Sequence, residues 1–313
     1  MTLKATEASR WRVLVTGAGG FLGRRLVPEM ARLGILVVAT GRQIPKEVEA
    51  AAEIVIRGNL GSPRVLTKAL KALVGRGEPG QFRGVIHLAG LSDAELARAD
   101  PLTAFEENVV RTYELLEACR GSKVRRFLFP STGLVYGKRC RKLFTEDSPP
   151  RPGSFYAATK LAAETLIQGY AEDYGFSCDI VRLSNIYGPG SPDNTVFGQI
   201  LRRIRARKEV RLRSLSPVRD FIYVDDVVTG FIRLLQTGGE QGYRVVNLSS
   251  GVGTAIGKLA RTALIAAGHN HRDRMSSFGR TEDVVILSNE RLEAITGWKP
   301  SRTLIEGLRK SIL

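Results

Sequence analysis

Tyr156 and Lys160, within the segment "SFYAATK" at 154–160, are the residues whose types and spacing point most clearly to proton chemistry. They lie four positions apart at the start of a stretch that is predicted to be helical, so both side chains project from one side of the helix. Tyrosine has a pKa of about 10 and needs a downward shift of about 3 units, roughly 4 kcal/mol, to act as an acid or base near pH 7. An ammonium group one turn away favours the phenolate and supplies part of this shift.

A glycine-rich segment near the N-terminus predicts a dinucleotide site. The segment "TGAGGFLGRRL" at 16–26 contains Gly17, Gly20 and Gly23 in a G-x-x-G-x-x-G pattern, after a strand-like run at 11–17 and before a predicted helix. Glycine lets the backbone turn tightly and approach a pyrophosphate without a Cβ atom in the way. The free N–H groups at the start of the helix would then face the phosphates.

The end of the second predicted strand, at 35–41, is where such a cofactor is usually selected. An acidic residue at this point would hydrogen-bond the ribose 2′-hydroxyl of NAD. Here Gly41 stands at that place and Arg42 follows, and a guanidinium group can bind a 2′-phosphate through two hydrogen bonds. We therefore expect NADP as the cofactor, with NAD as the alternative if Arg42 is only a solvated residue at a strand end.

A dinucleotide site also explains why Lys160 lies on the helical stripe that should face the interior. The stripe continues through Ala163, Ile167, Tyr170 and Tyr174. If it faces a cofactor, Lys160 can hydrogen-bond the nicotinamide ribose, and the oxidised ring adds a second positive charge beside the phenol. The alternative is a lysine whose ammonium reaches solvent at the edge of a domain.

A tyrosine that transfers protons also needs a partner that holds the substrate oxygen. The segment "PSTGLVYG" at 130–137 lies at the end of a predicted strand at 125–132, where ligands bind in open α/β sheets. Ser131 and Thr132 both offer a hydroxyl group there, so we expect them to contact a substrate.

Alternating strands and helices must position these residues. Strand-like runs occur at 11–17, 35–41, 53–58, 84–90, 125–132 and 178–184, and helical stretches near 24–34, 62–74, 101–120 and 155–174. This alternation predicts an α/β fold, a doubly wound parallel sheet covered by helices on both faces. After residue 184 the pattern loosens, with a basic helix at 196–208, a strand leading into a helix at 219–236, a helix near 255–267 and a terminal helix.

Two lobes are expected from this organisation. Residues 1–184 would form the dinucleotide-binding domain, with 219–242 returning to it, and residues 185–313 would form a smaller substrate-binding lobe. Hydrophobic residues make up 43% and charged residues 25% of the 313 positions, which is typical of a globular protein.

The formal net charge of +16 includes two dense clusters, "KRCRK" at 138–142 and "RRIRARK" at 202–208. Each is either a solvated face or a surface that attracts polyanions, whether nucleic acid or small anionic molecules.

The apolar runs are too short to span a membrane and the first residues lack a secretory signal. Cys119, Cys140 and Cys178 show no metal-type spacing, so we expect free thiols in a reducing cytoplasm.

Several spaced motifs together give the chain a specific resemblance. "TGAGGFLG", "HLAG", "NVVRTYELLEA", "PSTGLVYG", "YAATK", "RLSNIYGPG", "VRDFIYVDDV" and "TGWKP" follow one another in the order found in the extended short-chain dehydrogenase/reductases that act on nucleotide sugars. The resemblance covers nearly the whole chain. It implies a Rossmann-type fold with a smaller C-terminal substrate-binding lobe, a nucleoside-diphosphate sugar as substrate, and a homodimer.

By position, the resemblance also implies roles for individual residues. Thr132 matches the family's catalytic Ser/Thr, Tyr156 its acid/base, Lys160 the partner of the tyrosine and Asn108 a supporting amide, while Asn185 and Arg219 match substrate contacts. The positions implied to bind the cofactor are Gly17, Gly20, Phe21, Leu22, Gly23, Arg42, Asn59, Leu60, Leu88, Ala89, Gly90, Tyr156 and Lys160. Asn59 departs from the Asp that the family often uses to contact adenine, although an amide can also donate and accept hydrogen bonds.

The residues after Thr132 restrict the reaction. Gly133 and Leu134 stand where the family's dehydratases carry Asp-Glu, and neither can move a proton. The additional groups that the family's decarboxylases and 3,5-epimerases use are missing from this chain as well, so neither reaction is expected. We expect an NAD(P)-dependent 4-ketoreductase that acts on a nucleoside-diphosphate 4-keto-6-deoxyhexose, because Arg42 favours NADPH. The alternatives are a 4-epimerase that retains NAD and, from another class, an RNA-binding protein on the same fold, which the absence of aromatic residues within "KRCRK" disfavours.

Overall fold

The computed structural model describes residues 11–75, 82–122, 124–137, 143–238, 241–269, 275–279 and 283–312. They form two compact units. The first contains the residues up to Val135, Pro152–Val181 and Phe231–Val246, and the second contains Tyr136–Arg151, Arg182–Gly230 and the residues from Asn247 onward. Of the segment 219–242 that we expected to return to the first domain, only the part from Phe231 lies in the first unit. None of the described helices has both the length and the apolar character needed to span a membrane.

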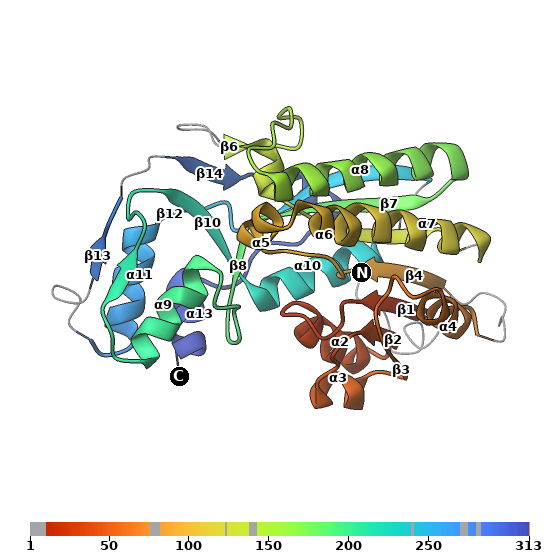
Figure 1. Ribbon diagram of the computed structural model, residues 1–313, viewed down its shortest axis with the longest axis horizontal. Coiled ribbons are helices and arrows are strands. Elements are labelled where there is room, and N and C mark those ends of the chain that lie inside the picture. The colour runs from red at the N-terminus through yellow and green to blue at the C-terminus, as the bar shows by residue number, and fades with distance from the viewer. Residues whose placement is uncertain are drawn as a thin grey trace. The chain divides into compact units, whose positions relative to one another are not determined.

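The first unit is built around a seven-stranded sheet (Figure 1). In spatial order its strands are β11 (Gly242–Leu248), β7 (Ser177–Leu183), β5 (Arg126–Thr132), β4 (Phe82–His87), β1 (Trp11–Thr16), β2 (Leu36–Gly41) and β3 (Ile54–Arg57). The pairs β1–β2, β1–β4, β2–β3 and β4–β5 are parallel. The strand order reverses at β1, which lies between β2 and β4, and this switch point is where open α/β sheets bind dinucleotides. The predicted fold class is confirmed.

Among the described residues, seven α-helices lie wholly within this unit. Six of them follow strands β1 to β4, and the seventh precedes β7. They are α2 (Gly23–Arg32), α3 (Lys46–Ala51), α4 (Pro63–Val74), α5 (Ala94–Ala99), α6 (Pro101–Phe105), α7 (Arg111–Gly121) and α8 (Phe155–Tyr174). A large buried core of the unit lies between the sheet and α4, α7 and α8, through Leu70, Leu116 and Ile167. Strands β1 and β5 are nearly continuous runs of buried residues, as expected for a parallel sheet with both faces covered.

The stretch 101–120, predicted as one helix, is divided in the structure. Between α6 and α7 lies a five-residue π-helical turn, η1 (Glu106–Val110). A π turn adds one residue to a helical turn and changes which side chains face inward. Here it places Asn108 in the interior, with only 1% of its surface exposed.

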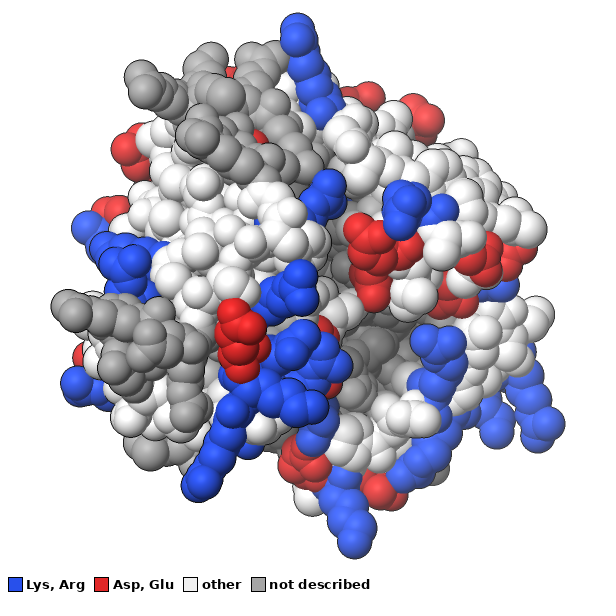
Figure 2. All heavy atoms as spheres, turned by 60° about the vertical axis from the view of Figure 1, so that its left-hand side comes forward, with Lys and Arg blue, Asp and Glu red and all other residues white. Residues whose placement is uncertain are grey.

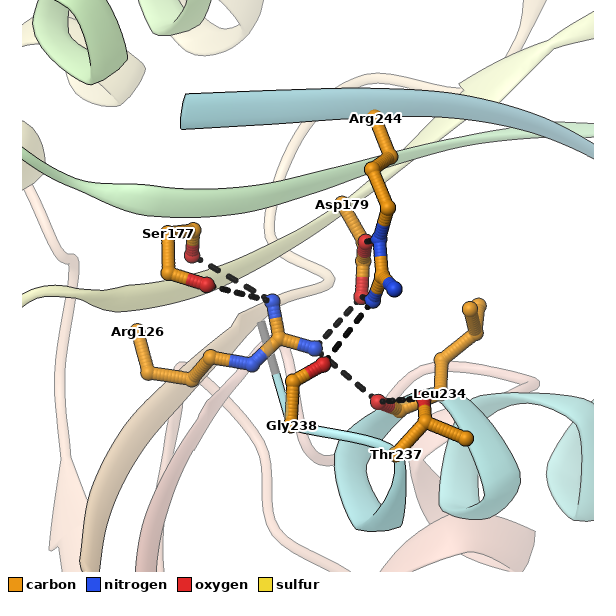
Figure 3. A network of polar contacts seen from close by, with 7 residues as sticks. All are labelled: Arg126, Ser177, Asp179, Leu234, Thr237, Gly238 and Arg244. Carbon is orange, nitrogen blue, oxygen red and sulfur yellow. Dashed lines mark hydrogen bonds and ion pairs between the residues drawn. The ribbon is translucent and has the colours of Figure 1, made fainter. Parts of the chain in front are cut away.

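A buried ion-pair network holds β5, β7 and β11 together (Figure 3). Asp179 on β7 is fully buried and accepts hydrogen bonds from Arg126 on β5 (2.5 Å) and Arg244 on β11 (2.7 Å). Arg126 also donates to the backbone oxygen of Leu234, at 2.9 Å, in α10 (Val224–Gln236). Since β5 begins at Arg126 and ends at Thr132, the network fixes the strand that carries the candidate hydroxyl groups.

The second unit contains a five-stranded and a two-stranded sheet. At the centre of the larger sheet, β10 (Val218–Tyr223) pairs in parallel with β8 (Asn185–Tyr187) and β14 (Val284–Leu287) and antiparallel with β12 (Gly253–Ala255), and β14 also pairs with β6 (Leu143–Phe144). The smaller sheet joins β9 (Val210–Leu212) to β13 (Met275–Ser277). The remaining helices are α9 (Val196–Arg205), α11 (Ile256–Ala266), α12 (Glu290–Thr296) and α13 (Leu304–Ile312).

Helix α9 ends three residues earlier than its sequence predicts. Arg207 adopts a left-handed backbone conformation with φ of 52°, and the N–H of Lys208 donates back to the carbonyl of Arg203 at 2.9 Å. This is the usual geometry of a helix C-terminus, where glycine is the favoured residue.

Candidate active site

The glycine-rich turn after β1 lies directly against the end of β4. Gly17 has a φ of +63°, and a Cβ atom at this position would lie 2.6 Å from the backbone nitrogen of Ala89 and 2.7 Å from the carbonyl carbon of Leu88. Only glycine fits this close approach. The turn therefore brings together two of the segments for which the resemblance implies cofactor contact.

Unused hydrogen-bond donors gather at the start of α2. The helix begins at Gly23 with no side-chain cap, and among the described residues no hydrogen bond uses the N–H groups of Phe21, Leu22 or Gly23. The preceding turn is closed by the N–H of Gly20, which donates to the carbonyl of Gly17 at 2.9 Å. Free N–H groups at a helix start fit the pyrophosphate of a dinucleotide.

Arg42 is exposed immediately after β2. The chain around it crosses the glycine-rich turn, because a Cβ atom on Gly19 would lie 1.8 Å from the carbonyl oxygen of Gln43. The sequence pattern did not single out Gly19. The first acidic residue after β2 is Glu47, which forms an ion pair with Arg24 at 2.8 Å. No acidic residue therefore stands directly at this strand end, where a carboxylate would bind a ribose 2′-hydroxyl group.

Asn59 is exposed after β3 and shapes the turn into α4. Its Oδ1 atom accepts the N–H of Gly61 at 3.0 Å, and its backbone carbonyl accepts the N–H of Ser62 at 3.0 Å. The next residue, Leu60, is buried in the core of the unit. The adenine contact implied for these two positions stays a prediction.

Helix α8 holds Tyr156 and Lys160 in its first two turns. Ser154 caps the helix by accepting the N–H of Ala157 at 3.2 Å, and the helix ends at Gly175 in a left-handed conformation. Only 9% of Tyr156 and 7% of Lys160 are exposed. The lysine is therefore buried, not extended into solvent, as expected if its helix face lines a site.

The electrostatics of this pair depend on burial. Burial raises the pKa of Tyr156 to about 12, and a hydrogen bond with the side chain of Thr132 acts in the opposite direction. Burial lowers the pKa of Lys160 to about 7, although the carboxylate of Glu164 raises it. The ammonium nitrogen lies 3.9 Å from the centroid of the Phe129 ring, a cation–π contact. Because burial disfavours the phenolate, an adjacent positive charge is what would bring Tyr156 into the range for proton transfer.

Asn108 joins the loop after β4 to α8. Its Oδ1 atom accepts the N–H of Leu91 at 2.8 Å, and its Nδ2 group donates to the carbonyl of Leu91 and to the hydroxyl of Thr159, both at 3.0 Å. Thr159 in turn donates to the carbonyl of Tyr156 at 2.8 Å. The amide also lies against Gly90, where a Cβ atom would be 2.8 Å from Oδ1. Asn108 therefore supports both sides of the site.

His87, which the sequence motifs did not assign a role, forms a buried hydrogen-bond chain behind the glycine-rich turn. Its Nδ1 atom lies 2.7 Å from the hydroxyl of Thr16, which accepts the N–H of Ala89, and its Nε2 atom lies 3.2 Å from the hydroxyl of Thr112. Thr112 donates to the carbonyl of Asn108, so Nε2 is assigned as the protonated nitrogen. Burial, assisted by the charge of Lys160, lowers the pKa of His87 to about 3.

This neutral histidine predicts a stability that decreases in acid. The pKa of His87 is lower in the folded state than the ordinary value of 6.5, so its contribution is fully present above pH 6.5 and is lost as the pH falls towards 3. The free energy of unfolding should fall between pH 6 and pH 4 by about 1.4 kcal/mol per pH unit more than in the variant His87→Asn. Urea titrations at several pH values measure this, and parallel curves for the two proteins would contradict it.

In the second unit, Asn185 and Arg219 lie on paired strands, where Asn185 is opposite Phe221. The side chain of Asn185 donates to the carbonyl of Asp220 at 3.1 Å. Arg219 forms an ion pair with Asp283 at 2.7 Å, and the sequence patterns gave no sign of this partner. The substrate contacts implied for Asn185 and Arg219 stay predictions.

Only one of the two basic clusters lies within the described residues. The cluster 138–142, which includes Cys140, lies outside the described residues, whereas Cys119 and Cys178 are buried free thiols. In the cluster 202–208, Arg202, Arg205 and Lys208 are exposed at the end of α9 and after it. Figure 2 shows Lys and Arg side chains standing out from this side of the molecule.

Comparisons with known proteins agree with this geometry. Residues 13–249 match the model of the NAD dependent epimerase/dehydratase family. The UDP-glucose 4-epimerase of Mycolicibacterium smegmatis is 30% identical over 313 residues, covering 96% of this chain and 97% of its own. The structure of MoeE5 in complex with UDP-glucuronic acid and NAD is 28% identical with a TM-score of 0.86, covering 96% of this chain and 97% of its own. The structure of RMD from Pseudomonas aeruginosa complexed with NADPH is 27% identical with a TM-score of 0.80, with the same coverage.

Proposed function

The chain belongs to the NAD-dependent epimerase/dehydratase family of nucleotide-sugar enzymes, and within this family we propose that it is a nucleotide-sugar 4-epimerase. By similarity to the relatives named above, the substrate would be UDP-glucose or UDP-glucuronic acid, and the reaction would invert the configuration at C4 of the sugar. This choice differs from the 4-ketoreductase that the sequence led us to expect, because the relatives favour the epimerase.

Similarity to 4-epimerases carries the choice over the reductase, and the groups at the end of β5 and the start of α8 support the chemistry. The side chains of Tyr156 and Thr132 form a hydrogen bond, Lys160 lies one helical turn after Tyr156, and the two residues after Thr132 are Gly133 and Leu134. Reversible oxidation of an alcohol needs one acid/base and one hydroxyl partner, whereas elimination of water needs further ionisable groups. The site therefore has the groups for C4 epimerisation and lacks those for dehydration at these positions.

The chain's own residues would divide the work as follows. A nicotinamide dinucleotide, for which the free N–H groups of Phe21, Leu22 and Gly23 provide a phosphate site, supplies the acceptor and donor for the hydrogen at C4. Tyr156 removes the proton of the C4 hydroxyl and later returns one to the same oxygen. Thr132 orients this oxygen, and Lys160 favours the phenolate. If the dinucleotide stayed bound, the 4-keto sugar could rotate and present the opposite face of C4 to it before reduction.

The purified protein, with no cofactor added, tests this proposal on UDP-glucose and UDP-glucuronic acid. We expect each active substrate to reach a mixture with its C4 epimer, as measured by NMR or ion-exchange chromatography. No conversion of either sugar without added cofactor, together with NADPH-dependent reduction of a 4-keto-6-deoxy sugar nucleotide, would favour the reductase instead.

The reductase remains the second candidate because of Arg42. A cofactor that is consumed by reduction is more often NADPH, and Arg42 is exposed at the strand end that selects the cofactor. One of the similar structures, RMD from Pseudomonas aeruginosa, contains NADPH. The same cation would also be compatible with an epimerase that retains NADP.

Replacing Arg42 by Ala should weaken the binding of NADP about 10- to 100-fold and change that of NAD little, because a charge-assisted bidentate contact to the 2′-phosphate is lost. Calorimetric titration of both cofactors measures the ratio of affinities. Arg32→Ala is the matched control, since Arg32 is an exposed arginine that pairs with Glu29 at the other end of α2. An unchanged ratio of affinities in Arg42→Ala would show that Arg42 does not select the cofactor.

A further inference from the structure

Glu164 is a fully buried carboxylate on the helix that carries Tyr156 and Lys160, with no part of its surface exposed. The three residues follow one another at four-residue intervals along α8. A buried carboxylate is costly unless it is hydrogen-bonded and faces a positive charge, and an apolar side chain would pack at such a position without this cost. The partners of Glu164 must therefore offset the cost of burying its carboxylate.

One partner comes from β5. The hydroxyl of Ser131 donates to Oε1 of Glu164, and Ser131 is itself 3% exposed. Ser131 directly precedes Thr132, whose side chain hydrogen-bonds Tyr156. Glu164 thus ties the last residues of β5 to α8, where the strand presents its hydroxyl groups.

A second neighbour is Lys160, one helical turn before Glu164, and the charge of Glu164 raises the pKa of Lys160. The charge of Lys160 in turn lowers the pKa of His87 on β4. Tyr156 lies one turn before Lys160 on the same helix. His87 is neutral above pH 3, and Phe129 on β5 contributes only its ring face. The carboxylate of Glu164 therefore offsets part of the cost of burying the ammonium.

We propose that Glu164 is a positioning residue of the site, whose buried carboxylate keeps Lys160 in its charged form and holds Ser131, and through it Thr132, in place. The inference rests on the proposed acid/base role of Tyr156. Lys160 favours the phenolate only while it carries its proton, so Glu164 sets the upper end of the pH range in which the site works. Glu164 is not expected to touch the substrate itself.

The variant Glu164→Gln tests this because it removes the charge and keeps the shape and an oxygen that can accept from Ser131. Without the carboxylate, the pKa of Lys160 should fall by about one unit or more below its value of about 7. NMR of the ¹³C-labelled lysine side chains follows this titration in the whole protein, and the signal is assigned by its absence in Lys160→Met. The alkaline limb of the kcat–pH profile should move to lower pH by a similar amount.

Two further variants complete the test. Glu172→Gln makes the same chemical change at an exposed position of α8 and should leave both the titration of Lys160 and the pH profile unchanged. Glu164→Asp keeps the charge but withdraws it from its partners, so its Lys160 titration should lie between those of the unmodified protein and Glu164→Gln. This variant decides the question by itself if Glu164→Gln does not fold.

Identical titration of Lys160 in the unmodified protein, Glu164→Gln and Glu164→Asp would overturn the proposal. This result is separate from failure of the proposed function, because the titration needs neither substrate nor turnover. If no sugar nucleotide is converted while the pKa of Lys160 falls in Glu164→Gln, the epimerase proposal fails and the electrostatic role of Glu164 stands.

Discussion

Replacing Tyr156 by Phe is expected to lower kcat about 10²- to 10⁴-fold while the cofactor still binds. The substitution removes one oxygen atom and keeps the ring that lies buried at the start of α8. Proton transfer to and from the C4 oxygen would then have to proceed without the phenol, and the hydroxyl of Thr132 has no comparable acidity. The geometry of the phosphate-binding turn is formed by other elements, so binding of the dinucleotide should be retained.

Steady-state turnover of the active UDP-sugar measures this effect, and calorimetry measures cofactor binding in the same preparation. Tyr174→Phe is the matched control, because Tyr174 lies on the same helix with 46% of its surface exposed. Its kcat should stay within about twofold of the unmodified protein. More than a tenth of the original kcat in Tyr156→Phe would mean that another group transfers the proton.

Replacing Asp179 by Asn should lower the free energy of unfolding by about 3–5 kcal/mol. Asp179 is fully buried between Arg126 and Arg244, and only 5% of the Arg126 side chain is exposed (Figure 3). The amide has nearly the same shape as the carboxylate, so the change removes the charge without making a cavity. The buried guanidinium of Arg126 and the half-buried one of Arg244 would then lack their counter-charge, and breaking a buried pair in this way is strongly destabilising.

Urea unfolding of the two proteins gives the difference directly. Glu29→Gln is the control, since it makes the same chemical change in the exposed pair with Arg32 and should alter the stability by less than about 1 kcal/mol. A comparable small effect for Asp179→Asn would show that the network in Figure 3 contributes little to holding β5, β7 and β11 together.

Local patterns predicted the parts of the molecule that depend on neighbouring residues in the chain. Strands β1 to β5, strand β7 and the long helix α8 follow from hydrophobic runs and their periodicity. Short elements of the second unit, such as β8 and β12 with three residues each, carry too few positions to show a period. Helix α3 was missed for the same reason, because it has only six residues.

Contacts between distant residues could not be predicted from one sequence. The π turn that turns Asn108 inward, the approach of Gln43 to Gly19 and the pairing of Ser131 with Glu164 each depend on how separate elements pack. The phenol also differs from expectation. The spacing of Tyr156 and Lys160 suggested that the lysine lowers the pKa of the tyrosine, but burial raises the pKa of the phenol and lowers that of the amine.

The identity of the reaction is likewise only partly contained in local sequence. Gly133 and Leu134 restrict the chemistry by their inability to move protons, which leaves both an epimerase and a reductase. Arg42 concerns which cofactor binds, and not whether the reduced cofactor stays bound. The two reactions differ in the rotation of an intermediate and the release of a dinucleotide, and neither leaves a residue pattern that a sequence shows.

The fate of the hydrogen at C4 tests the central proposal most directly. UDP-glucose that carries deuterium at C4 is incubated with the purified protein and no added cofactor, and the sugar nucleotides are then examined by NMR and mass spectrometry. A 4-epimerase predicts a mixture of both C4 epimers, each with its deuterium still at C4, since the hydrogen removed from one face returns to the other. Transfer of the deuterium to a released cofactor, with net oxidation of the sugar and no second epimer, would contradict the proposal.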